Sequence, residues 1–287
     1  MLADFINIVL SGVALGMLLF LITGGLSVVM GLMGFANMAH GSFAMLGGYI
    51  CAALVNDLAW PFLLALPAAA VATAAVGAVL ERLIFCRLYQ IAELEQVLLT
   101  VGLVFMSVAM ANYVFGSVPV TVPLPHFLSG AAEFAFFDLA IYQLFLIGFG
   151  GVLIAAMVLG IQRTNFGAKI RAAVDNRRMT TSCGVNVDRL FMLAFALGTG
   201  LAGLGGALSV NLLGLDPVFP LRYLVLMLLV VVVGGLGSVH GTLIAALLLG
   251  VGDVVGKYYV HEAGAFFIYA IPVVVLLIRP IGLFGRR

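Results

Sequence analysis

The chain alternates long apolar stretches with short polar ones. A transmembrane helix needs about 20 predominantly apolar residues, and runs close to that length recur along the whole sequence. Continuous runs predict helices, because the strands of a membrane barrel would instead alternate over about 10 residues. We therefore expect an all-α, polytopic transmembrane helical bundle of about eight to nine membrane segments. The expected segments cover residues 5–30, 42–55, 61–80, 97–115, 139–161, 190–213, 223–233, 242–256 and 265–278.

The apolar pattern is interrupted twice by glycine-rich stretches that also carry a histidine. The first covers residues 31–41 and the second residues 234–241. Irregular backbone at membrane depth is tolerated only where protein or a watery cavity covers it, so we expect two broken or re-entrant elements that face the protein interior. Both place His-Gly and a hydroxyl residue just before an apolar helix. Paired interruptions of this kind point to a binding site in repeat-built transporters.

The two interruptions supply candidates for a substrate path. Half-helix N-termini attract a carboxylate and exposed carbonyls suit an ammonium, so this uncharged lining favours a small zwitterion or a neutral amide. Two other interpretations stay open: the histidines could be hydrogen-bonded within a helix interface, and the glycines could serve close packing. The candidates are Asn37, His40, Gly41, Ser42, Gly234, Gly235, Gly237, Ser238 and His240.

Residues 162–189 hold six of the chain's 13 Lys and Arg residues, between two long apolar segments. Asn165 can cap a helix start, apolar residues recur at helical spacing over 166–174, and Gly184 fits a left-handed stop. This basic helical segment predicts a docking surface through which a soluble partner could act on the membrane helices. The alternative is that its charges only fix membrane orientation, since cytoplasmic loops carry excess Lys and Arg.

The composition excludes a soluble domain. The chain is 64% hydrophobic and 9% charged, with a mean hydropathy of +1.26, whereas soluble domains are about 25% charged. We expect a single transmembrane domain over residues 1–287 whose first segment is retained rather than cleaved. A net charge of +1 argues against a nucleic-acid partner. The three cysteines lack metal-ligand spacing, so we expect no metal site.

The distribution of charge predicts the membrane orientation. Loops at 81–96 and 162–189 carry Arg and Lys, whereas residues 116–138 carry none. Because basic loops stay on the cytoplasmic side, we expect the first two inside and the third outside. Counting crossings on this basis gives nine segments and an external N-terminus. A re-entrant geometry at either interruption would lower the count and could move the N-terminus to the other side.

Catalytic chemistry is not expected in this chain. The serine and histidine of each interruption lie two residues apart and do not face each other on a helix, so they cannot form a nucleophile with its base. The GDVVGK stretch at 252–257 lacks the spacing and the Ser or Thr of a phosphate-binding loop. The spans are nearly free of the charges that ion-driven carriers use, and we expect Asp253 to pair with Lys257. The energy source is therefore expected in another subunit.

Four motifs run through the chain in the order found in one transporter family. They are GLMGFANMAHGSFAMLGGY at 31–49, TNFGAKIRAAVDNRRMTTSCGVNVDR at 164–189, GGLGSVHG at 234–241 and RPIGLFG at 279–285. With them the chain resembles, over essentially its whole length, the LivH-type permease of branched-chain amino acid ABC importers. The resemblance implies translocation of branched-chain or related amino acids across the inner membrane, driven by ATP hydrolysis in partner subunits. The alternatives are a permease of the same type for urea or short amides, and a stand-alone secondary carrier.

The resemblance also implies partners and a location. The chain would be a multi-pass protein of the bacterial inner membrane, surrounded by lipid and paired with a LivM-like second permease. Two cytoplasmic ATPase subunits would bind ATP and Mg, and a periplasmic solute-binding protein would deliver ligand; the chain itself would need no cofactor. Ser42 stands where the family commonly has an acidic residue. The helix around 168–183 looks like the family's coupling helix, with coupling residues expected at Lys169, Arg171, Ala172, Ala173, Asp175, Asn176 and Gly184.

Overall fold

The computed structural model describes residues 2–34, 37–89, 91–134, 137–260 and 264–285, which form a bundle of helices. The helices are α1 (Leu2–Met33), α2 (His40–Asn56), α3 (Phe62–Leu80), α4 (Cys86–Leu88), α5 (Glu93–Phe115), α6 (Ile141–Arg163), α7 (Asn165–Asp175), α8 (Arg177–Ser182), α9 (Val187–Leu213), α10 (Phe219–Gly234), α11 (Val239–Tyr259) and α12 (Gly264–Ile278). One π-helical turn, η1 (Glu81–Phe85), joins α3 to α4, and two strands, β1 (Ala131–Phe134) and β2 (Phe137–Ala140), form a hairpin.

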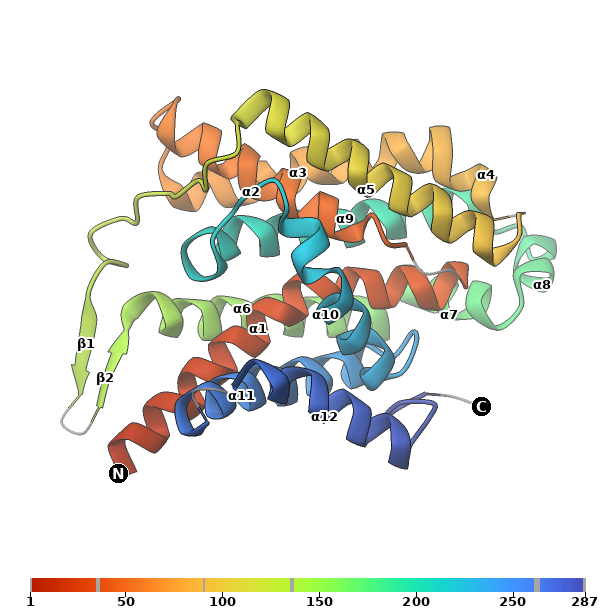
Figure 1. Ribbon diagram of the computed structural model, residues 1–287. Coiled ribbons are helices and arrows are strands. Elements are labelled where there is room, and N and C mark those ends of the chain that lie inside the picture. The colour runs from red at the N-terminus through yellow and green to blue at the C-terminus, as the bar shows by residue number, and fades with distance from the viewer. Residues whose placement is uncertain (1, 35–36, 90, 135–136, 261–263, 286–287) are drawn as a thin grey trace.

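The long helices run roughly side by side, from left to right in Figure 1. The short helices α7 and α8 lie at the right-hand end of the bundle, and the β1–β2 hairpin lies at the left-hand end. We call these the basic end and the hairpin end. Six helical stretches in the described part of the chain are long and apolar enough to cross a membrane; they belong to α1, α3 with its extension to Leu88, α5, α6, α9 and α11. The all-helical membrane fold is thus confirmed, and the two short strands of the hairpin are a local addition to it.

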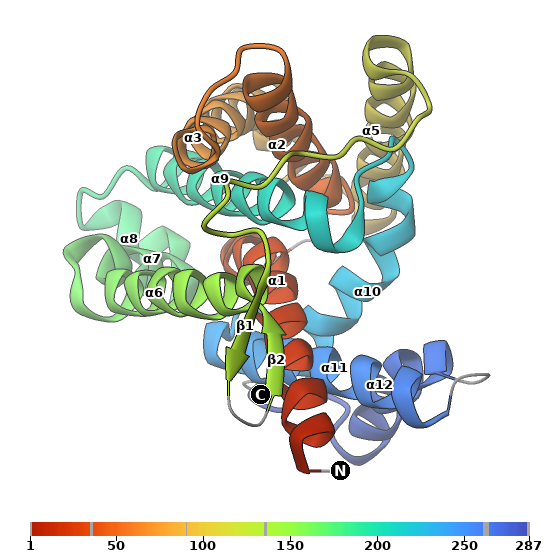
Figure 2. The ribbon, with the colours of Figure 1, turned by 90° about the vertical axis from the view of Figure 1, so that its left-hand side faces the viewer.

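Helices α1 and α9 form the centre of the bundle (Figure 2). Glycines allow their backbones to approach closely: a Cβ on Gly25 of α1 would overlap the backbone of Gly198 in α9. On another face of α1, a Cβ on Gly16 would lie 2.8 Å from the Leu247 Cα of α11. Small residues are favoured at such contacts in membranes because dispersion replaces the hydrophobic effect as the attraction between helices. Close packing is therefore one role of the glycines between residues 198 and 206.

A buried hydrogen bond also joins α1 to α11. The Thr242 hydroxyl donates to Ser27 Oγ at 2.8 Å, and Thr242 and Ser27 are both fully buried. We expect Thr242→Val to lower the stability of the purified protein by about 0.6–1 kcal/mol, because interhelical hydrogen bonds in membranes are worth about that much. A lower midpoint of thermal unfolding would show this. Thr181→Val on α8, where the exposed hydroxyl bonds only within its own helix, is the control; equal midpoints for the two variants would contradict the role of this bond.

Two peripheral helices present broad apolar faces. On α5, Leu98, Phe105 and Met110 are more than half exposed, and Val152 of α6 is similarly exposed. A helix that is apolar on its outer face suits a lipid environment. Apolar side chains cost free energy when they face water, but they cost none when they face lipid tails. In Figure 2, α5 lies at the margin of the bundle. We infer that lipid or another membrane subunit covers these faces.

Candidate functional site

The first interruption folds back into the bundle. Helix α1 ends at Met33, yet α2 begins at His40 beside Ile22, because His40 Nε2 donates to the Ile22 carbonyl oxygen at 3.1 Å. Ile22 precedes Met33 by about three helical turns, or roughly 16 Å. The chain therefore returns from the basic end to the middle of the bundle before α2 starts. Residues 35 and 36 of this interruption lie outside the described residues.

Two buried polar groups of this interruption have free hydrogen-bonding capacity. Asn37 is 2% exposed and His40 1% exposed, which agrees with the expectation that the interruption faces the interior. Asn37 Oδ1 accepts from the Ala39 amide at 3.0 Å, but Asn37 Nδ2 and His40 Nδ1 have no partner among the described residues. Since His40 Nε2 donates, Nδ1 of the neutral ring is an acceptor. Buried polar atoms are normally paired, so these two atoms are available to a solute or water.

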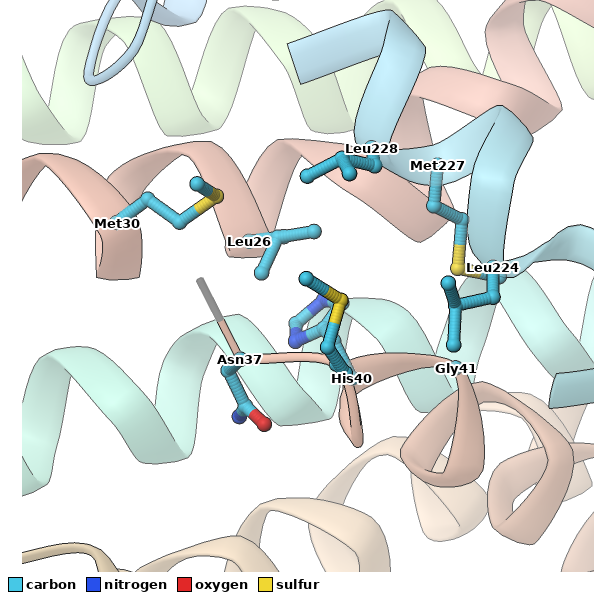
Figure 3. Close-up of a pocket in the computed structure, with 9 residues that line it drawn as sticks. Leu26, Met30, Asn37, His40, Gly41, Leu224, Met227 and Leu228 are labelled. Carbon is cyan, nitrogen blue, oxygen red and sulfur yellow. The ribbon is translucent and has the colours of Figure 1, made fainter. Parts of the chain in front are cut away.

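A small cavity lies between the first interruption, α1 and α10. Figure 3 shows leucine and methionine side chains of α1 and α10 grouped around it, while the Asn37 amide points away from Leu26 and Met30. Its volume is about 10 Å³, which is room for about one water. In this conformation the space is therefore closed to a solute. The residues that line it are Leu26, Met30, Asn37, Met38, His40, Gly41, Leu224, Met227 and Leu228.

The N-termini of α2 and α10 meet beside this cavity. A Cβ on Gly41 would lie 3.3 Å from the Pro220 Cα and 3.4 Å from Met227 Sδ. Helices α2 and α10 have 17 and 16 residues, so each spans about 24–26 Å, less than the roughly 30 Å of a bilayer core. Both begin inside the bundle. Because the N-terminus of a helix carries a partial positive charge, two of them together favour a carboxylate.

Ser42, the fourth candidate of this interruption, faces α5. The Ser107 hydroxyl donates to Ser42 Oγ at 2.7 Å, and both side chains are half-buried. This is a polar contact between α2 and α5. The structure therefore brings Asn37, His40, Gly41 and Ser42 together at the meeting point of α1, α2 and α10, with α5 alongside.

The second interruption lies elsewhere, at the basic end. Gly235 and Gly237 adopt positive φ angles of 97° and 77°, and a Cβ on Gly237 would lie 2.9 Å from the Gly31 Cα near the end of α1. Ser238 caps α11 by accepting from the Gly241 amide at 3.2 Å. His240 is exposed, and its Nε2 lies 3.1 Å from Gln162 Nε2 at the end of α6. The structure does not bring these residues into one pocket with His40.

Gly234 directly precedes Gly235 and is the last residue of α10. A Cβ there would lie 2.5 Å from the Thr242 amide nitrogen, so Gly234 lets α10 pack closely against the start of α11. Its partner Gly241 faces the Gly234 carbonyl in the same contact. Close packing thus accounts for Gly234, whereas Gly235 and Gly237 are required by their backbone conformation.

The basic segment forms two short helices rather than one. Thr164, not Asn165, caps α7 by accepting from the Gly167 amide at 3.2 Å. The single helix expected from apolar spacing breaks at Asn176, whose extended backbone lets its side chain cap α8 through the Met179 amide at 3.0 Å. The asparagine side chain thus competes with continuation of the helix. Gly184 has a φ of 81°, which confirms the left-handed stop.

Most of the expected coupling residues are on the surface of the basic end. Six are exposed: Lys169, Arg171, Ala172, Asp175, Asn176 and Gly184. Ala173 is different, because it is 3% exposed and packs with Ile170 of α7 and Phe191 of α9. Ala173 therefore holds α7 against α9, whereas the six exposed residues are free to meet another protein.

A groove of about 560 Å³ joins the basic segment to the second interruption. Arg171 and Asp175 of α7 line it together with Gly237, Ser238 and His240. The Arg171 Nη1 group also donates to the Ile161 carbonyl oxygen of α6. Residues that the sequence assigned to two roles, path and coupling, thus form one surface at the basic end.

Sequence reasoning missed one pair of opposite charges. It named no residue between the expected segments 190–213 and 223–233, but the structure puts Arg222 in the first turn of α10, near the middle of the bundle, paired with Asp216. The available signal was a lone arginine directly before an apolar run.

The expected pair of Asp253 with Lys257 is confirmed at 2.6 Å. Within the described ranges, no three His, Cys, Asp or Glu residues are grouped as metal ligands would be.

Comparisons with known proteins agree on one family. The family model described as "Branched-chain amino acid transport system / permease component" matches residues 8–277. The chain is 28% identical to the high-affinity branched-chain amino acid transport system permease protein LivH of Salmonella typhimurium and to that of Escherichia coli, with 98% of this chain and 96% of each relative covered. It is 27% identical to BraD of Pseudomonas aeruginosa, with the same coverage.

A solved structure has a similar fold. PsaBC from Streptococcus pneumoniae, in complex with a Fab, matches with a TM-score of 0.51 over 97% of this chain and 95% of that one. The sequences are 14% identical, so the similarity concerns the fold alone.

Proposed function

Because the chain belongs to the permease components of branched-chain amino acid transport systems, we propose that it translocates branched-chain or related amino acids, driven by ATP hydrolysis in partner subunits. It is a multi-pass membrane permease of the inner membrane. In this proposal the chain is one transmembrane domain over residues 1–287. It catalyses no reaction and holds no cofactor, and ATP and Mg bind to the partner ATPases.

The observation that carries the amino-acid path is the meeting of α2 and α10 inside the bundle. Their N-termini provide partial positive charge, and Asn37 Nδ2 adds a buried donor while His40 Nδ1 adds an acceptor. A carboxylate and an ammonium on one small molecule match this mixture better than a metal ion or a phosphate does. The cavity of about 10 Å³ represents the closed path, which must widen for a solute to pass.

The arrangement of helices supports nine crossings. Helix α2 runs from the middle of the bundle back to the hairpin end, and α2, α10 and α12 each provide a shorter crossing beside the six long ones. With α7 and α8 inside, as the positive-inside rule requires, α1 begins outside and Arg279 ends the last crossing inside. The β1–β2 hairpin then lies outside, where a binding protein would dock.

The proposed complex contains this chain, a LivM-like second permease, two cytoplasmic ATPases and a periplasmic solute-binding protein. The exposed coupling residues of 162–189 would meet the ATPases. Motion of α7 would pass to the second interruption through the shared groove, because Arg171 and Asp175 line it together with Gly237 and His240. Gly237 touches Gly31 at the end of α1, from which the chain continues to Asn37 and His40.

A substrate panel tests the proposed function. The complete complex, reconstituted in vesicles with ATP on the ATPase side, should take up L-leucine, L-isoleucine or L-valine, or a related amino acid, in preference to urea and acetamide. Uptake of urea or acetamide alone would replace the amino-acid proposal by the short-amide alternative. Binding of the same panel to the isolated solute-binding protein gives an independent measurement of preference.

We expect Asn37→Ala and His40→Ala each to lower uptake roughly fivefold, because each removes a hydrogen-bonding group worth about 1 kcal/mol. The yield of assembled complex should stay the same. Ser117→Ala is the control, since its exposed hydroxyl donates to Asn112 Oδ1 at the end of α5, away from the path and from residues 162–189. Uptake at the level of the control by both path variants, at equal yield, would remove these two residues from the path.

A further inference from the structure

Arg222 presents an unusual combination of depth and exposure. It belongs to the first turn of α10, which begins beside Gly41 in the interior of the bundle rather than at one of its ends. Its side chain is nevertheless 50% exposed. A guanidinium facing lipid at such depth is costly, and intramembrane arginines instead face a bundle interior or a watery cavity. The exposed half of Arg222 must therefore meet water or another subunit.

Asp216 holds this arginine in place. Its Oδ2 accepts from Arg222 Nη2, and its side chain is 14% exposed. The other carboxylate oxygen, Oδ1, is buried and has no partner among the described residues. A carboxylate accepts through both oxygens, so Asp216 keeps free capacity for a second cationic group.

A second unpaired group lies near Asp216. Tyr49 of α2 is 1% exposed, its hydroxyl has no partner among the described residues, and it lies within electrostatic range of Asp216. The packing agrees, because a Cβ on Gly48 would lie 2.9 Å from the Leu215 side chain, next to Asp216. The Tyr49 ring stacks on Phe115 of α5 at 4.2 Å, which gives the cluster an apolar wall. A buried hydroxyl without a partner is rare, and here it lies within electrostatic range of a carboxylate that has an unpaired oxygen.

We propose that Arg222, Asp216 and Tyr49 form a binding site for a zwitterionic α-amino acid on the outer part of the path. Arg222 binds the α-carboxylate, and the guanidinium is well shaped for bidentate pairing with it. Asp216 Oδ1 and the Tyr49 hydroxyl bind the α-ammonium. In the closed conformation Asp216 occupies Arg222 in place of the substrate carboxylate. This inference rests on the proposed function, because it assumes that the substrate is an amino acid. It adds that the substrate is recognised by both its α-carboxylate and its α-ammonium.

Exchanging the charges of Asp216 and Arg222 distinguishes a substrate-binding site from a purely structural ion pair. The variants Arg222→Gln and Asp216→Arg/Arg222→Asp are reconstituted in the complete complex and assayed for uptake of L-leucine and L-alanine. The matched control is Asp253→Asn/Lys257→Gln, which neutralises another ion pair on α11. We expect at least tenfold lower uptake in both Arg222 variants and uptake within twofold of wild type in the control. Restored uptake in the swapped pair would show that the pair is structural and would overturn the site.

A chemical-rescue experiment covers the case in which Arg222→Gln does not assemble. Arg222→Cys is made in a chain whose Cys51, Cys86 and Cys183 are replaced by Ala, Ser and Ser. A membrane-impermeant cationic thiol reagent should restore part of the uptake of L-leucine, and an anionic reagent should not. Absence of labelling, or equal restoration by both reagents, would overturn the site. A wild-type complex that takes up no amino acid would instead refute the proposed function and this inference with it.

Discussion

Replacing Gly47 by alanine is expected to destabilise the assembled permease by about 2 kcal/mol. Gly47 lies where α2 crosses α9, and a Cβ there would overlap the Cα and carbonyl oxygen of Gly203. Alanine favours a helix by about 1 kcal/mol over glycine, but overpacking a close contact costs about 1–3 kcal/mol or more. Backbone atoms of two helices cannot move aside as a flexible side chain can. The overlap should therefore outweigh the gain and displace α2, which carries His40 at its start.

A matched glycine on α6 should respond in the opposite direction. Gly148 is exposed, and a Cβ there would meet no atom within 4 Å, so Gly148→Ala keeps only the helix-propensity gain. In thermal unfolding of the purified complex, Gly47→Ala should lower the midpoint by roughly 5 °C. Gly148→Ala should leave it unchanged or raise it slightly. Similar midpoints for the two variants would show that the α2–α9 contact is looser than described.

Arg171→Ala is expected to lower uptake roughly thirtyfold while ATP hydrolysis by the assembled complex continues. Arg171 is exposed at the basic end, lines the groove with the second interruption, and donates to the Ile161 carbonyl oxygen of α6. Its loss removes a docking charge and loosens α7 from α6. Coupling between distant sites is typically worth about 1–3 kcal/mol, which corresponds to about 5- to 150-fold in uptake.

Arg87→Ala provides the control for charge. Arg87 is exposed in the helical extension of α3 that follows η1, and its removal lowers the cytoplasmic positive charge by the same amount. If Arg171 only fixes membrane orientation, the two variants should have the same uptake and the same amount of inserted protein. If it couples, Arg171→Ala should lose uptake at normal insertion while Arg87→Ala stays within twofold of wild type. Equal uptake in both variants would refute docking at Arg171.

The sequence predicted the helices well because membrane insertion leaves a strong local signal. A span must satisfy its backbone internally and expose apolar side chains, so hydropathy alone located the segments to within a few residues. The left-handed stop at Gly184 and the pair of Asp253 with Lys257 were also predictable, because each depends on neighbours in sequence. The break at Asn176 was not, since the apolar spacing stops at Val174 without marking a helix end, and it is the competing side-chain cap of Asn176 that ends α7.

The sequence could not predict how deeply a given residue lies within the helix bundle. His40 and His240 occupy similar motifs, yet the first is buried beside Ile22 and the second is exposed beside Gln162. A turn near Asp216 looks the same whether it remains outside or folds back, so Arg222 was overlooked. Only the packing of Gly41 against Pro220 shows that α10 starts inside the bundle.

The central claim is that this permease has no energy source of its own and depends on ATPase subunits that act at its basic end. The most direct measurement compares vesicles that contain the two permeases alone with vesicles that contain the complete complex. Both are supplied with the loaded binding protein outside and are tested with and without imposed proton and sodium gradients. The account predicts uptake of L-leucine, or of the amino acid that the binding protein prefers, against its concentration gradient only with the ATPases and ATP. Uphill uptake by the permeases alone under either ion gradient would contradict it.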